Sequence, residues 1–151
     1  MSDDGQQVQD LLEGIRVAMV TTPGPDGLCS RPMTVQRVDA DGVVWFLVDA
    51  DADWVPSGEV EANAAFVDDD TWVSLAGTAT LVTEEATVAR LGDPVSGAWF
   101  QDGASPAALK VVTTHADWWT APGRLRRVLN IAGGVLSGHR PDMGDRGSAE
   151  P

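Results

Sequence analysis

Two runs of strand-forming residues, Leu28–Val38 and Val43–Asp49, are separated only by the segment Asp39–Gly42. A connection this short and rich in turn-forming residues joins two antiparallel strands as a hairpin. Pro32 lies inside the first run and has no backbone N–H to donate. We therefore expect the first strand to be a sheet edge or to carry a bulge at this position. The hairpin commits this part of the chain to an antiparallel sheet.

Further strand and helix signals flank the hairpin. Val8, Leu11, Leu12 and Ile15 recur with helical spacing and predict a short amphipathic helix near the N-terminus. The other expected elements are strands over Arg16–Thr22, Ala65–Val67, Thr71–Val82, Leu109–Thr114 and Asp117–Thr120, and helices over Asp53–Asn63, from Thr83 to near Gly92, over Val95–Phe100 and over Leu125–Leu136. Six or so strands with short turns predict a mainly β protein, a small antiparallel barrel with peripheral helices.

The chain of 151 residues is long enough for one domain with a hydrophobic core. We expect a single domain over residues 1–136. Residues 137–151 are rich in Gly, Pro and charged side chains, and this composition predicts a flexible or extended C-terminal tail.

The formal net charge of −13 argues against nucleic acid or an anionic membrane as a partner, because both are bound through clustered Lys and Arg. No apolar run approaches the roughly 20 residues that a membrane span needs. The acidic N-terminus lacks the pattern of a secretory signal, and a single Cys forms no intramolecular disulfide. These features predict a cytoplasmic protein.

Several short motifs in a fixed order carry a family resemblance. They are Gly14–Thr22, Ser30–Met33, Trp45–Phe46, Val73–Ala79, Ala98–Phe100, Trp118–Gly123 and Leu136–Pro141. In their order and spacing the chain resembles the FMN-binding split-barrel proteins related to pyridoxamine 5'-phosphate oxidase, of the general stress protein type. The resemblance implies a six-stranded antiparallel split barrel that forms a homodimer, with the ligand sites at the subunit interface.

The resemblance also implies where a flavin would lie. The residues expected along the flavin ring are Arg31, Pro32 and Met33. Trp45 and Phe46 would lie on the adjacent strand, under the ring or the ribityl chain, and Trp119 of the partner subunit would close the pocket. An apolar slot with a few fixed polar groups suits a planar cofactor.

The chain departs from the family pattern at the flavin phosphate. There the loop after the third strand usually supplies a Thr, a Ser and a Lys, and the matching residues here are Val48, Ala52 and Trp54. Of these only Trp54 has a side-chain donor. Each lost charge-assisted bond is worth roughly 1.5–3 kcal/mol, so phosphate affinity is expected to fall about a thousandfold or more. The acidic run that begins at Asp49, itself a predicted site residue, would repel a phosphate, although Arg31 and Arg37 share a strand face and could compensate.

Two functions from different classes stay open. In the first, the protein is an FMN-binding, oxidoreductase-like flavoprotein, in which a deazaflavin could replace FMN. In the second, the barrel holds no flavin, and a pocket lined by Trp54 and Trp119 binds, cyclises or isomerises an apolar small molecule. Neither hypothesis assigns a catalytic side chain or a metal ligand, and the sequence leaves open whether the protein is an enzyme.

Overall fold

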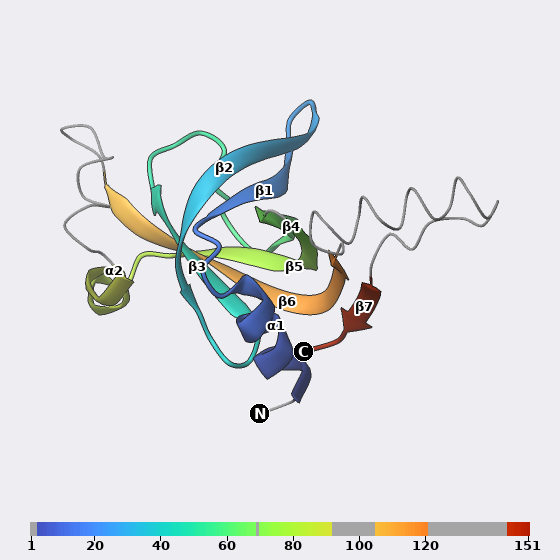
Figure 1. Ribbon diagram of the computed structural model, residues 1–151. Coiled ribbons are helices and arrows are strands. Elements are labelled where there is room, and N and C mark those ends of the chain that lie inside the picture. The colour runs from blue at the N-terminus through green and yellow to red at the C-terminus, as the bar shows by residue number, and fades with distance from the viewer. Residues whose placement is uncertain (1–2, 69, 92–104, 121–144) are drawn as a thin grey trace, which may run out of the picture.

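The computed structural model describes residues 3–68, 70–91, 105–120 and 145–151. Its strands curl into a barrel, with helix α1 (Asp3–Leu12) packed near both chain ends and helix α2 (Glu85–Leu91) on another side (Figure 1). The strands are β1 (Val17–Gly24), β2 (Gly27–Val38), β3 (Val43–Asp49), β4 (Val60–Asp68), β5 (Thr71–Val82), β6 (Pro106–Thr120) and β7 (Asp145–Ala149). No helix of the described residues is long and apolar enough to cross a bilayer.

The strand order is β3-β2-β1-β4-β5-β6-β7, with all neighbours antiparallel, and a further pairing of β3 with β6 closes the first six strands into a barrel. This confirms the predicted six-stranded antiparallel barrel. β7 lies outside the closed ring and pairs with the C-terminal part of β6, from Ala116 to Thr120. The described end of the C-terminal segment is therefore a strand of the sheet.

The barrel core follows from the alternation of apolar residues along each strand. Strand β4 shows the pattern clearly, because Ala62, Ala64 and Phe66 are buried while the residues between them are not. The large side chains that are fully buried at the centre include Phe46, Phe66, Leu75, Leu109, Val20, Val44, Val73 and Val111. From α1, Val8 and Leu12 pack onto the same core, which confirms the predicted amphipathic helix.

Pro32 lies where β2 has a neighbour on one side only. β2 pairs with β1 along Gly27–Thr34, but with β3 only from Val35 to Val38, with a bulge at Gln36. The Val35 amide donates to the Arg16 carbonyl on the β1 side at 2.8 Å. Since backbone groups alternate in direction along an antiparallel ladder, Pro32 faces the open edge, where a missing N–H costs no hydrogen bond. The predicted edge strand is confirmed.

The predicted helix over Asp53–Asn63 is wrong. The chain forms turns and bends from Ala50 to Gly58, and β4 then begins at Val60, well before the expected Ala65. The prediction placed Pro56 in the first turn, where proline is tolerated, but Gly58 inside the same segment disfavours continuing a helix. The alternating small residues of β4 are weak strand formers, and the pairing with β1 and β5 makes them a strand.

The two predicted strands Leu109–Thr114 and Asp117–Thr120 are one strand, β6, of 15 residues. A bulge at Thr114, opposite the step from Ala76 to Gly77, shifts the register within it and explains the apparent interruption. Helix α2 begins at Glu85, so Glu84 and not Thr83 precedes its first residue. The helical turn expected over residues 95–100 and the helix over 125–136 lie outside the described residues.

The close approach of the β5 and β6 backbones beside the bulge requires a glycine at position 77. A Cβ at this position would lie 1.8 Å from the Val112 carbonyl oxygen, a backbone atom that cannot move without disturbing the ladder. We predict that Gly77→Ala lowers the free energy of unfolding by about 1–3 kcal/mol in urea denaturation. Gly58→Ala is the matched control, because a Cβ there meets nothing within 4 Å and should change stability by less than about 0.5 kcal/mol. Equal effects of the two substitutions would contradict this account of the bulge.

Candidate functional site

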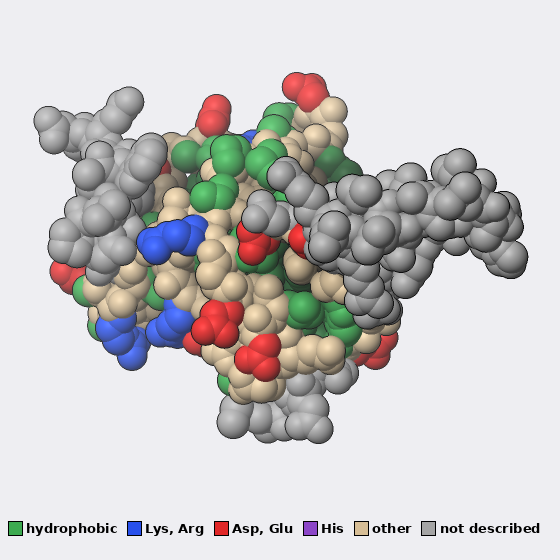
Figure 2. Space-filling model, in the orientation of Figure 1, with side chains coloured by type: hydrophobic (Ala, Val, Ile, Leu, Met, Phe, Trp, Pro, Cys, Tyr) green, Lys and Arg blue, Asp and Glu red, His purple; other side chains and the backbone are tan. Residues whose placement is uncertain are grey.

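The barrel is split between β2 and β3. β3 leaves β2 after the pair Val35–Phe46 and continues beside β6 alone, from Leu47 to Asp49. The edge of β2 from Leu28 to Thr34 thereby has no partner strand among the described residues. By the alternation described above, the carbonyls of Ser30, Pro32 and Thr34 face this open edge. Figure 2 shows hydrophobic side chains gathered over β2 and the loop after β3, with an acidic side chain near them.

Arg31 and Trp54 meet beside this split. The Arg31 guanidinium carbon lies 4.4 Å from the centroid of the Trp54 ring, and Nη1 donates to Thr22 Oγ1 at 3.4 Å. Trp54 in turn packs on the barrel core from the loop after β3. Within the described part of the chain, Arg31 forms no ion pair. Its positive charge is thus held by a neutral hydroxyl and an aromatic face, and an anionic or carbonyl group of a ligand can approach it.

The loop after β3 is held by its own carboxylates. Asp49 Oδ1 accepts hydrogen bonds from the backbone N–H of Asp51 at 3.0 Å and of Ser105 at 3.3 Å. The Ser105 hydroxyl donates to Asp51 Oδ2 at 2.9 Å. Asp49 therefore orders the loop and the start of β6 together, and its carboxylate occupies the position where two backbone amides converge.

The predicted ring-contact residues separate onto different faces. Phe46 is fully buried and Met33 is nearly so, and both point into the barrel core. Pro32 is exposed on the opposite side of β2. The structure therefore brings Arg31 and Trp54 together at the split, with Met33 behind them in the core.

Trp45 points away from the core, because its neighbour Phe46 points inward. It packs in a separate cluster with Val43, Leu91 and Ala108, beneath α2. Its indole N–H donates to Asp39 Oδ2 at 2.9 Å. The cations of Arg37 and Lys110 lie 5.4 and 5.6 Å from the ring centroid, and Arg37 is also paired with Asp39 at 2.7 Å. Arg37 is thus engaged on the outer surface, away from Arg31.

Trp119 lies on the outer face of the sheet, away from Arg31 and Trp54. It pairs with Trp72 of β5, which pairs with Val67 of β4, so the three side chains form one row. Their exposed fractions are 64% for Val67, 40% for Trp72 and 39% for Trp119. Met19, which is 44% exposed, lies on the neighbouring strand β1. We call Val67, Trp72 and Trp119 the outer apolar row.

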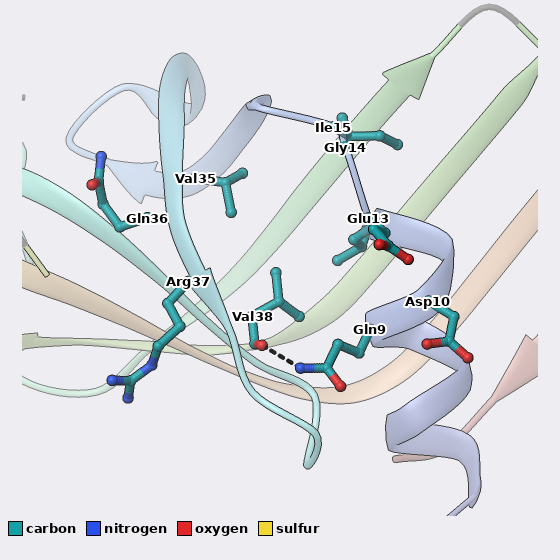
Figure 3. Close-up of a pocket in the computed structure, with 10 residues that line it drawn as sticks. Gln9, Asp10, Glu13, Gly14, Ile15, Val35, Gln36, Arg37 and Val38 are labelled. Atoms are coloured by element: carbon teal, nitrogen blue, oxygen red, sulfur yellow. Dashed lines mark hydrogen bonds between the residues drawn. The ribbon is translucent and has the colours of Figure 1, made fainter. Parts of the chain in front are cut away.

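A groove of about 480 Å³ lies between α1 and β2, and none of the predicted site residues lines it. Gln9 of α1 donates to the Val38 carbonyl at 2.8 Å and so joins the two walls (Figure 3). Figure 3 also shows the Arg37 side chain extending from β2 away from α1. Gln36, the bulged residue of β2, is one of the residues that line the groove.

Sequence reasoning missed two residues of the site, Thr22 and Ser105. Thr22 is buried near the end of β1, and the sequence indicated only that it belongs to a strand. Its contact with Arg31 depends on the register between β1 and β2. Ser105 lies 54 residues after Asp51, and only the β3–β6 pairing brings them together. Neither residue had a motif that could have revealed its role.

The comparisons with known proteins agree with this architecture. The family model described as "Pyridoxamine 5'-phosphate oxidase like" matches residues 3–142. A protein described as a general stress protein 26 from Jannaschia sp. CCS1 is similar over 100% of both chains, with 27% identity and a TM-score of 0.75. A protein described as a general stress family protein from Xanthomonas campestris pv. campestris has 26% identity and a TM-score of 0.65, over 82% of this chain and 92% of that chain. The general stress FMN/FAD binding protein from Xanthomonas citri has 27% identity and a TM-score of 0.64, over 78% of this chain and 87% of that chain. No curated protein matches the chain.

The hydrogen bond between Ser105 and Asp51 should control the order of the loop after β3. We predict that Ser105→Ala weakens local structure by about 1 kcal/mol and speeds hydrogen exchange of the Asp51 and Ala52 amides about fivefold. Ser57→Ala, in the same loop and exposed, is the control and should leave these exchange rates unchanged. Unchanged exchange in Ser105→Ala would show that the carboxylate of Asp49 alone holds the loop.

Proposed function

Because the chain belongs to the pyridoxamine 5'-phosphate oxidase-like family, we propose that it is a flavin-binding, oxidoreductase-like protein that holds a flavin ring in the split between β2 and β3. One similar structure is described as an FMN/FAD binding protein, which supports a flavin such as FMN as the class of ligand. The bound flavin would act on a small molecule, and no side chain of the site is assigned a catalytic role.

One observation carries the proposal, namely Arg31 beside an unpaired strand edge. Arg31 forms no ion pair within the described residues, and the neighbouring carbonyls of Ser30, Pro32 and Thr34 face the same opening. Backbone donors and acceptors that a sheet leaves unpaired are costly unless water or a ligand satisfies them. A planar heterocycle with polar groups along one edge would satisfy them.

The residues fit the flavin ring better than its phosphate. For the ring, the chain offers the open backbone edge, the Arg31 cation and the indole of Trp54. For the phosphate, the loop after β3 offers carboxylates, and the backbone amides of Asp51 and Ser105 already donate to the Asp49 carboxylate. We therefore assign the binding of the flavin ring to the split, and we assign no basic side chain to the binding of its phosphate.

The roles of the chain's residues follow from their positions. Arg31 would place a positive charge beside the polar edge of the ring, and Thr22 holds its guanidinium in place. Trp54 would limit the access of water from the loop side. Flavin, when bound, supplies hydride or single-electron transfer, so that the protein need only bind, orient and shield it.

We further propose a homodimer that buries the outer apolar row. Large apolar side chains adjacent on one sheet face and 39–64% exposed are typical of a surface that another subunit covers. In such a dimer Trp119 would contribute to the partner's ligand site, as the family resemblance implies. Figure 1 shows β4, β5 and β6, which carry the row, side by side.

A second function is favoured by the stack of Arg31 on Trp54. In that arrangement the indole already covers the cation that a flavin would use. The alternative is a flavin-free barrel that binds an apolar small molecule against Trp54 and orients it for cyclisation or isomerisation, or merely carries it.

Removal of Arg31 tests the flavin proposal. We predict that Arg31→Ala weakens FMN binding about 10- to 150-fold, since a hydrogen bond to a charged group contributes about 1.5–3 kcal/mol. The measurement is quenching of flavin fluorescence in a titration. Arg16→Ala removes the same charge from an exposed position and should leave the affinity unchanged. If Arg31→Ala bound flavin as tightly as the natural chain, the ring would not lie at the split.

The dimer proposal predicts that Val67→Asp produces monomers at micromolar concentration, because the substitution removes apolar burial and places a charge in the interface. Sedimentation velocity measures the change. Leu28→Asp is the matched control, because Leu28 is 78% exposed at the β1–β2 hairpin, away from the outer apolar row. A dimer that survives Val67→Asp, or a natural chain that is monomeric, contradicts this interface.

A further inference from the structure

We infer that the split selects a flavin without a phosphate: a planar heterocycle whose side chain is uncharged, as in riboflavin. The inference rests on the proposed function and specifies the ligand of that same site. It follows from three observations on the loop after β3.

The first observation is that the chain supplies its own anion. Two backbone amides, of Asp51 and Ser105, converge on Asp49 Oδ1 at 3.0 and 3.3 Å. Converging backbone amides of this kind are what proteins commonly use to bind phosphate oxygens. Here a phosphate could bind only by displacing a carboxylate that is covalently part of the loop and is therefore always present at high effective concentration.

The second observation is the charge around these two amides. Asp51 and Asp53 are both exposed beside Asp49, so an incoming phosphate dianion meets three carboxylates. Among the basic residues whose side chains are described, Arg37 and Lys110 are engaged at Trp45 on the outer surface. The Arg31 cation lies over the Trp54 indole. Within the described part of the chain, no basic side chain forms an ion pair with Asp49, Asp51 or Asp53, so these carboxylates stay unneutralised.

The third observation is the nature of the neighbouring surface. Ala50, Trp54 and Val55 of this loop pack on the core and are only partly buried, so the loop has an apolar surface. An uncharged polyol or alkyl chain can lie against such a surface without losing the hydration of a dianion. The loop thus favours a neutral ligand, because its carboxylates repel a phosphate and its apolar side chains can contact an uncharged chain.

Titration of the full chain with riboflavin and with FMN, followed by flavin fluorescence, tests the inference. We expect riboflavin to bind at least tenfold more tightly than FMN at low salt. The ratio should narrow at about 0.5 M salt, where exposed charges are screened over a few ångström. Lumiflavin, which has neither phosphate nor ribityl chain, measures the contribution of the ring alone.

Two variants test whether the loop after β3 causes the preference for riboflavin over FMN. Trp54→Lys introduces a cation at the loop and removes the same ring contact for both ligands, so it should raise the affinity for FMN relative to that for riboflavin, measured as the ratio of the two dissociation constants. Asp53→Asn removes one carboxylate that takes part in no hydrogen bond among the described residues, so it should raise FMN affinity severalfold without disturbing the fold. Asp26→Asn, at the β1–β2 turn, makes the same charge change elsewhere and should have no effect on either ligand.

The possible outcomes separate the two proposals. Tighter binding of riboflavin, with FMN gaining in Trp54→Lys and Asp53→Asn only, supports the inference. Equal or tighter binding of FMN overturns it while leaving the proposed flavin site in place. Binding of none of the three flavins overturns the proposed function together with this inference, and favours the flavin-free alternative.

Discussion

The pairing of β3 with β6 is the interaction on which the rest of the structure depends. Seven residue pairs, from Val43–Val112 to Asp49–Pro106, close the sheet into a barrel. β3 stays with β6 over all seven pairs but with β2 only through the bulge at Gln36, which leaves the edge of β2 around Pro32 open. The course of β3 thus both closes the core and opens the site.

The site combines groups of opposite electrostatic character within a short stretch of chain. Arg31 lies inside the split against Trp54, with no carboxylate among the described residues to neutralise it. In the loop that carries Trp54, the carboxylate of Asp49 accepts hydrogen bonds from two backbone amides, and Asp51 accepts one from the Ser105 hydroxyl. This separation of charge distinguishes one end of a ligand from the other: it attracts a polar ring edge and repels an anionic tail. A pocket of uniform charge would make no such distinction.

Local patterns predicted the strands that are continuous and apolar. The bounds of β3, Val43–Asp49, and of β5, Thr71–Val82, are those expected from the sequence, because both strands are rich in β-branched and aromatic residues and lie next to clear turn signals. β4 was misread, since its inward Ala62 and Ala64 have low strand propensity, and its strand state depends on partners distant in sequence. Among the candidate site residues, Arg31 and Trp54 were found together, but Trp45 packs beneath α2 and Phe46 is in the core. Only the direction of each side chain decides this.

The sequence by itself determined the class of fold, the family and the absence of the family's phosphate-binding side chains at Val48, Ala52 and Trp54. The alternation of apolar and polar residues, the turn residues and the order of the motifs are properties of the sequence, and they can be recognised without a structure. The tertiary structure decided which strand edge is open, that Thr22 supports Arg31, and that Asp49 binds the amide of Ser105. The contact of Thr22 with Arg31 depends on the β1–β2 register, and that of Asp49 with Ser105 depends on the β3–β6 pairing between segments more than 50 residues apart. No local pattern encodes such a distance, because many registers satisfy the same alternation and only packing of the whole core selects one.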